Sequence, residues 1–135
     1  ISGGSKTSVG GYDEGREEEN SAQFDTDDAR PLDEVIAWLL ELGYLPSFCT
    51  ACYRAGRTGE TFMEEVKNFQ IAQFCQPNAI MTLEEYLSDY ATASTRALGE
   101  RRIEEFLDDV ERADLREKAR ENVAKIRAGE RDFRF

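Results

Sequence analysis

The chain has 135 residues, of which 28 are acidic and 17 basic, and its formal net charge is −11. This length fits one small domain, and the acidic excess disfavours a nucleic-acid partner because phosphate contacts need clustered lysine and arginine. We expect no membrane span, since no apolar run approaches the ~20 residues that a transmembrane helix needs. We expect a cytoplasmic protein, since no signal peptide is recognisable and an odd number of cysteines does not make a secreted disulfide framework.

The first 30 residues contain five glycines and show little helical periodicity. An irregular stretch of this length is unusual at the head of a compact domain, so we expect the chain to be the C-terminal piece of a longer protein. In this interpretation residues 1–5 end a strand of a preceding domain. The run Gly4–Thr7 is not a convincing phosphate-binding loop, because Ser5 stands where that motif requires glycine.

The first predicted helix covers residues 31–42. Pro31 fits the first helical position, and acidic residues follow it where the positive end of the helix dipole favours them. Apolar residues recur at helical spacing, namely Leu32, Val35, Ile36, Leu39 and Leu40. Gly43 is the expected terminator, and Pro46 predicts an extended segment over residues 44–48. We expect Trp38 to lie in the core.

The three cysteines are Cys49, Cys52 and Cys75. A C-x-x-C pair can grip one metal centre from a tight turn, and the next element must fold back to deliver the third sulfur. Three thiolates are too few for a tetrahedral zinc site, and the chain has no histidine to complete one. A 4Fe–4S cluster can use three thiolates and leave one iron open. Ordinary buried cysteines are one alternative; a thiol–disulfide pair is another, although it expects a βαβ setting that is not visible.

Two arginines, Arg54 and Arg57, follow the cysteine pair and are candidate residues of the cluster environment. Their charge would offset that of the thiolates, and Gly56 and Gly59 would let backbone N–H groups approach sulfur. The alternative is a turn with solvent-facing arginines. A second helix, predicted over residues 60–69, would return the chain to the third cysteine.

The remaining helices follow from apolar spacing and from end signals. A turn is predicted at residues 76–78, and a capping box at residues 82–85 predicts the start of a third helix. Its apolar face would comprise Leu83, Tyr86, Leu87 and Tyr90. Gly99 is expected to interrupt this helix before a fourth one at residues 103–110. A fifth helix is predicted around residues 115–126, ending near Gly129.

The last five residues, 131–135, contain two phenylalanines that are too apolar to leave in water. Burial of each side chain could contribute ~1.5–3 kcal/mol. We therefore expect this segment to pack back on the body of the protein or on a preceding domain, in contrast to the usual frayed terminus.

Four stretches resemble the C-terminal region of one family, the radical S-adenosylmethionine (SAM) tyrosine lyases that mature FeFe-hydrogenases. They are residues 19–28 (ENSAQFDTDD), 46–59 (PSFCTACYRAGRTG), 74–79 (FCQPNA) and 131–135 (RDFRF). The head of the chain is also similar to the end of the barrel in the related thiamine-pathway tyrosine lyase, which lacks a C-terminal cluster.

This resemblance implies a function. In the family, a radical-SAM barrel cleaves tyrosine to p-cresol and dehydroglycine, and dehydroglycine is converted to carbon monoxide and cyanide at a second, C-terminal iron–sulfur cluster. The products leave as an iron carbonyl cyanide unit for hydrogenase assembly. Cys49, Cys52 and Cys75 match the three ligands of this auxiliary 4Fe–4S cluster, whose open iron carries a further iron held by a barrel histidine.

The resemblance also implies what the chain lacks. It contains no C-x-x-x-C-x-x-C motif for the SAM cluster and no histidine, so SAM and its own 4Fe–4S cluster would be bound by the missing barrel. We expect the chain alone to be inactive, with no catalytic residue of its own. Ser5 and Lys6 would lie at the barrel rim, either facing substrate or as structural residues. Its partners would be the missing barrel and the proteins of hydrogenase maturation.

The fold predicted from all of this is mostly α. Residues 31–135 would form a small helical iron–sulfur domain, the auxiliary-cluster domain. Residues 1–30 would be the end of the barrel and a linker, so that the helical domain is appended to the last strand and loop of a (β/α) radical-SAM barrel missing from this chain. The competing hypothesis is a helical interaction domain that is metal-free, or whose cysteines bind zinc with an aspartate or water.

Overall fold

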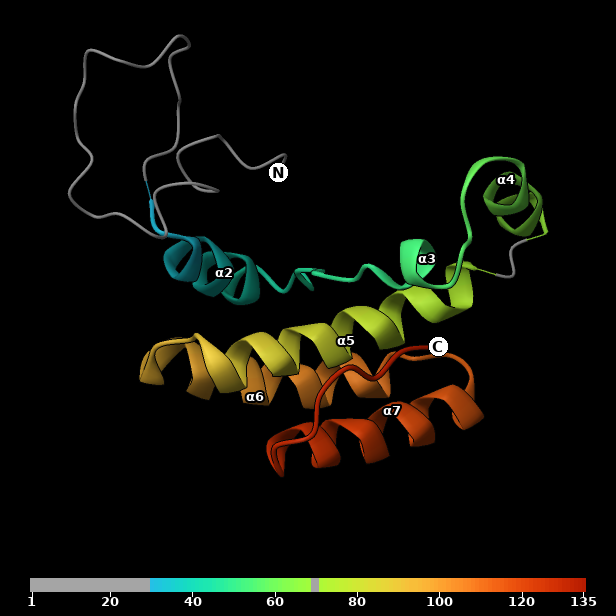
Figure 1. Ribbon diagram of the computed structural model, residues 1–135. Helices are drawn as coiled ribbons and strands as arrows, with labels where there is room; N and C mark the ends of the chain where they lie inside the picture. Colours follow the sequence, from blue (N-terminus) through green and yellow to red (C-terminus); the bar gives the residue numbers. More distant parts are fainter. Residues whose placement is uncertain (1–29, 69–70) are drawn as a thin grey trace, which may run out of the picture.

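The computed structural model describes residues 30–68 and 71–135, and all regular structure within these ranges is helical. The helices are α2 (Leu32–Glu41), α3 (Ala51–Arg54), α4 (Gly59–Lys67), α5 (Ala72–Asp89), α6 (Ala93–Asp108) and α7 (Ala113–Arg127), as Figure 1 shows. The mostly α class is therefore confirmed for the described residues. The strand expected at residues 1–5 lies outside them.

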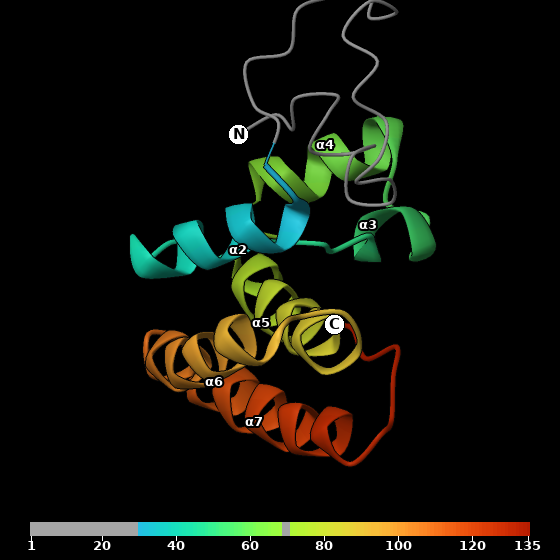
Figure 2. The ribbon, with the colours of Figure 1, turned by 90° about the vertical axis from the view of Figure 1, so that its left-hand side faces the viewer.

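The core is formed where α5, α6 and α7 pack side by side and α2 packs against α6 (Figures 1 and 2). Apolar residues of these helices are removed completely from solvent, among them Leu40, Ile80, Leu83, Leu87, Ile103 and Leu107. By contrast, α3 and α4 lie at one end of α5 and outside this core (Figure 1). Within the described residues, no helix combines the length and apolar composition needed to cross a membrane.

The first helix agrees with its prediction. Helix α2 begins after Pro31 and is followed by Gly43, whose φ is +81°. The Gly43 N–H donates to the Leu40 carbonyl, and the Tyr44 N–H donates to the Leu39 carbonyl at 2.9 Å. This pattern is a Schellman cap. The prediction for Trp38 is wrong, because its side chain is 39% exposed.

Helix α5 runs through the turn predicted at residues 76–78. Pro77 lies inside the helix and removes one helical donor, which usually costs ~3 kcal/mol. Its side chain is fully buried together with Ile80 and Met81, and burial of such side chains offsets that cost. Thr82 is not a helix cap either, because it lies in mid-helix and its hydroxyl donates to the Asn78 carbonyl at 3.0 Å.

The break between the third and fourth predicted helices lies at residues 90–92 and not at Gly99. Helix α6 starts at Ala93, and the Thr92 side chain caps it by accepting a hydrogen bond from the Thr95 N–H. Gly99 lies within α6, where it faces α5. Tyr90, which was expected on the apolar face, is 76% exposed, because α5 ends at this point.

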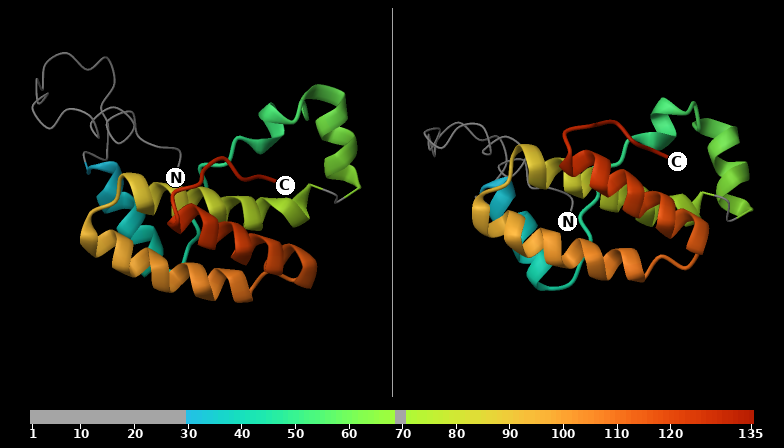
Figure 3. Two further views of the ribbon diagram at one scale, coloured as in Figure 1. Left: turned by 60° about the horizontal axis from the view of Figure 1, so that its bottom comes forward. Right: turned by 90° about the horizontal axis from the view of Figure 1, so that it is seen from below.

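The last helix and the end of the chain follow the prediction. Helix α7 is followed by Gly129, whose φ is +104°. The Glu130 N–H donates to the Lys125 carbonyl at 3.0 Å, so this helix ends in the same kind of cap as α2. The chain then turns back over α5 toward α3, as both views in Figure 3 show.

Candidate metal centre

The three cysteines come from two parts of the fold. Cys49 precedes α3, Cys52 lies on α3, and Cys75 lies in the first turn of α5. All three are free thiols, the first two partly buried and Cys75 exposed. Although Cys75 is exposed as a residue, partial desolvation of its thiol raises the pKa of that group, and the charges of Cys52 and Cys49 raise it further. The three cysteines thus lie on two separate elements of the fold, and their convergence on one metal centre stays a prediction.

The C-x-x-C pair sits on a compact turn. Ala51 is 4% exposed and anchors α3, and its N–H donates to the Cys49 sulfur at 3.4 Å. After α3 the chain reverses at Gly56, whose φ is +69°, and the Arg57 N–H donates to the Cys52 carbonyl at 2.8 Å. A backbone donor beside a cysteine sulfur stabilises the thiolate form that binds metals, and such hydrogen bonds tune cluster potentials.

The donor set fits a cluster better than a single zinc ion. Across residues 30–68 and 71–135, no group of three or more His, Cys, Asp or Glu side chains is arranged to hold one metal ion. A zinc ion would need its sulfurs about 3.8 Å apart, given Zn–S bonds of about 2.3 Å. In a 4Fe–4S cluster each thiolate binds a different iron, so the sulfurs lie further apart. Three thiols in a chain without histidine match the number of ligands that such a cluster needs when one iron is left open.

The two arginines next to the cysteine pair contact distant parts of the chain. The Arg54 guanidinium pairs with both carboxylate oxygens of Asp132, with 2.7 Å between Nη2 and Oδ2. Arg57 pairs with Glu65 at 3.3 Å and lies 5.8 Å from the centre of the Phe74 ring. These partners show what fixes the two guanidinium groups, whereas their influence on a cluster stays a prediction.

The C-terminal segment, residues 131–135, packs back on the protein as predicted. The Phe135 ring stacks on Phe74 with 6.2 Å between ring centres, and the Phe135 N–H donates to Asn78 Oδ1 at 2.9 Å. Its carbonyl accepts from Arg57 at 3.4 Å. The segment therefore contacts both α5, which carries Cys75, and the turn that follows the C-x-x-C pair.

Sequence reasoning missed Asp132 and Glu85 as neighbours of this site. The Asp132 N–H donates to Glu85 Oε1 at 2.7 Å, and both residues line a cavity of about 110 Å³ that also touches Cys49 and Arg54. Glu85 had been assigned to a capping box. No local pattern could have revealed the pairing of Arg54 with Asp132, because 78 residues separate them.

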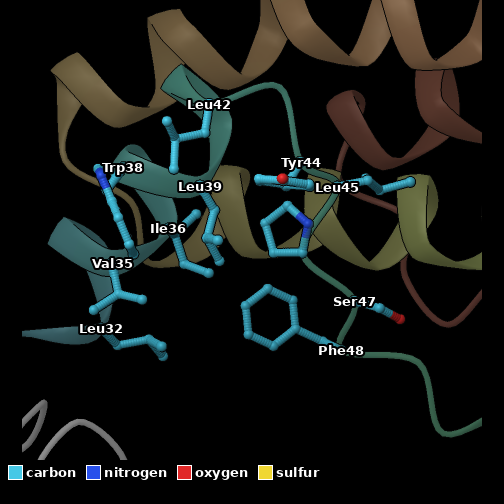
Figure 4. Close-up of a pocket in the computed structure, with 11 residues that line it drawn as sticks. Leu32, Val35, Ile36, Trp38, Leu39, Leu42, Tyr44, Leu45, Ser47 and Phe48 are labelled. Atoms are coloured by element: carbon cyan, nitrogen blue, oxygen red, sulfur yellow. The ribbon is translucent and has the colours of Figure 1, made fainter. Parts of the chain in front are cut away.

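A second hollow lies away from the cysteines. It is an apolar groove between α2 and the extended segment that follows it, and Figure 4 shows Leu39, Tyr44 and Phe48 among the side chains around it. Trp38 lines this groove, which accounts for its exposure. Ser5 and Lys6, the predicted substrate-side residues, lie outside the described part of the chain.

These features define an α-helical domain whose described part carries three free thiols, on α3, just before it and on α5. No family model and no curated protein matches the chain significantly. Among solved structures, the chain is similar to the crystal structure of HydG, a maturase of the [FeFe]-hydrogenase, with 44% sequence identity and a TM-score of 0.81. The match covers 87% of this chain and 26% of HydG. The chain thus resembles HydG and spans about a quarter of the length of that protein, and the resemblance seen in the sequence is confirmed.

Proposed function

We propose that the chain is the auxiliary iron–sulfur cluster domain of a radical SAM tyrosine lyase that serves FeFe-hydrogenase maturation in the cytoplasm. The observation that carries the proposal is the 44% identity to HydG over 87% of the chain. The C-x-x-C pair on the turn at α3 and the third cysteine in the first turn of α5 supply the three thiols that such a domain needs.

In this proposal Cys49, Cys52 and Cys75 each hold one iron as a thiolate. When bound, the cluster supplies an iron open to a further ligand, at which dehydroglycine would be converted to carbon monoxide and cyanide. The Ala51 N–H stabilises the negative charge on the Cys49 sulfur. The Arg54 guanidinium is paired with the Asp132 carboxylate, so its part in the proposal is to fix the turn that carries Cys49 and Cys52.

The remaining steps belong to parts of the enzyme outside this chain. SAM, its 4Fe–4S cluster and tyrosine cleavage to p-cresol are assigned to the barrel, because the chain has neither the three-cysteine motif nor a histidine. The chain alone would therefore be inactive. Its partners would be that barrel, which would also hold the extra iron, and the hydrogenase maturation proteins that receive the product.

Anaerobic reconstitution with iron and sulfide tests the proposal. We expect a brown protein with about four iron and four sulfide per chain. Cys75→Ala should lose most of both, whereas Thr50→Ser, a conservative change beside the same ligands, should keep them. A colourless protein that takes up zinc in preference to iron, or iron uptake that does not depend on Cys75, would overturn the proposal in favour of a zinc-binding or metal-free interaction domain.

A further inference from the structure

Asp132 has an unusual backbone conformation. Its φ is +73°, in the left-handed region that side chains other than glycine rarely adopt, although aspartate tolerates it better than most. Such a conformation persists only where the surroundings hold it, and it concentrates at functional sites. At Asp132 the surroundings are the Glu85 carboxylate, which accepts its N–H, and the guanidinium of Arg54, which binds its side chain.

The C-x-x-C turn has few other anchors. Of the residues in α3, Ala51 is the one that is buried, and α4 buries none of its side chains. A segment with so little buried surface opens readily. The two-oxygen pairing of Arg54 with Asp132 therefore ties this turn to the C-terminal segment.

The other end of the C-terminal segment is fixed beside Cys75. Phe135 stacks on Phe74, the residue before this cysteine, and its N–H is bound by Asn78 on the next turn of α5. The C-terminal segment thus connects the turn that carries Cys49 and Cys52 with the start of α5, which carries Cys75. We infer that Asp132 is a positioning residue that holds the turn carrying Cys49 and Cys52 against the start of α5, where Cys75 lies.

This inference rests on the proposed function, because the cluster is the reason for which the thiols would need to be positioned. The Arg54 and Asp132 side chains are 46% and 51% exposed, and an exposed pair of this kind shifts a local equilibrium by about fivefold at most. A shift of this size is small for the stability of the whole fold. It is large for a turn that few other contacts hold.

The test measures how often the thiols meet in the metal-free protein. In a Cys49→Ser background, a bifunctional thiol reagent such as dibromobimane can bridge Cys52 to Cys75, and peptide mapping by mass spectrometry follows the rate. Asp132→Asn keeps the size and the tolerance of positive φ but removes the charge. We expect it to slow bridging by about twofold to fivefold, while the thermal unfolding temperature stays unchanged.

Two further variants isolate the pair. Arg54→Met should slow bridging by the same factor, and adding Asp132→Asn to it should cause no further change, because the two residues act through one interaction. Glu121→Gln removes another exposed carboxylate that binds two cations, and it should leave the rate unchanged. A rate unaltered by Asp132→Asn, or equal slowing in Glu121→Gln, would overturn the inference.

The experiments distinguish a failure of the positioning role of Asp132 from a failure of the proposed cluster function. Bridging is measured without metal, so a slower rate in Asp132→Asn supports the positioning role even if reconstitution yields no iron–sulfur cluster. Normal bridging in Asp132→Asn together with full iron content in the unmodified chain would refute the positioning role and leave the proposed function standing.

Discussion

Gly99 on α6 lies directly against Leu87 on α5, so that a Cβ atom at position 99 would be 2.4 Å from Leu87 Cδ1. Leu87 is completely buried, and in a close-packed interior its methyl groups can withdraw only by displacing their neighbours. The absence of a side chain at Gly99 is therefore what allows α5 and α6 to approach so closely, and it explains why a residue that weakens helices stands in mid-helix.

Gly99→Ala should lower the free energy of unfolding by about 1–2 kcal/mol. The reason is that the penalty for overpacking exceeds the stabilisation from the higher helix propensity of alanine. Urea denaturation measures this. Adding Leu87→Ala should make room, so the double variant should lose less than the sum of the two single changes. Stabilisation by Gly99→Ala alone would mean that the helices are not in close contact here.

Phe135→Ala should destabilise the protein by about 1–2 kcal/mol, since it removes a partly buried ring and its stacking on Phe74. Thermal unfolding measures the loss. Deleting residues 132–135 should cost more and should also lower the iron content after reconstitution. Tyr53→Ala is the control, because its side chain is 81% exposed. If the deletion changed neither quantity, the segment would be a frayed end.

Glu84 and Glu121 should give stability opposite dependences on pH. Burial raises the pKa of Glu84 above its ordinary 4.5, although Arg127 opposes this rise. Hydrogen bonds from Lys125 and Lys118 lower the pKa of Glu121 to about 2. The contribution of Glu84 is therefore present below pH 4.5 and is lost as pH rises through its raised pKa. That of Glu121 is present above pH 4.5 and is lost as pH falls toward 2.

Unfolding titrations of Glu84→Gln and Glu121→Gln across this range test both signs. As pH rises, the free energy of unfolding of Glu84→Gln should increase relative to that of the unmodified protein. The free energy of unfolding of Glu121→Gln should decrease relative to it. Added salt should weaken the second effect, because the Glu121 ion pairs are exposed. If the stability differences of both variants from the unmodified protein changed in the same direction with pH, the opposite roles assigned to Glu84 and Glu121 would be wrong.

Cys49→Ala in the full-length enzyme should separate the two halves of the proposed chemistry. p-Cresol should still form, because tyrosine cleavage is assigned to the barrel, whereas carbon monoxide should fall sharply because the auxiliary cluster has lost one thiolate. Both products can be measured in one reaction, with Thr50→Ser as the control. Equal loss of both would mean that the domain supports the barrel and has no separate step.

Much of the fold could be predicted from local patterns. The helices around residues 31–42 and 115–126 follow from apolar spacing that agrees with end signals, and the helix around residues 60–69 follows from apolar spacing alone. The errors arose where tertiary packing overrides a local signal. Pro77 suggested a turn, yet its burial keeps α5 continuous, and Gly99 suggested a break, yet it is a contact point between helices.

The site was predictable in part. The spacing of the cysteines suggested a shared centre, which stays a prediction, and the structure places the three thiols on α3, just before it and at the start of α5. The role of Arg54 and Arg57 in binding the C-terminal segment could not be inferred, because their partners are about 80 residues away and no periodic pattern links them.

The different anchoring of the cysteines has a consequence for how the protein matures. Cys75 belongs to a helix of the core, whereas Cys49 and Cys52 lie on a turn that can open by itself. Hydrogen exchange should therefore show slow amides in α5 around Leu83 and fast ones in α3 and α4. A chain built in this way can complete its folding with the turn still open. Under the proposed function, iron and sulfide would then enter a finished scaffold, and the turn would close over them last.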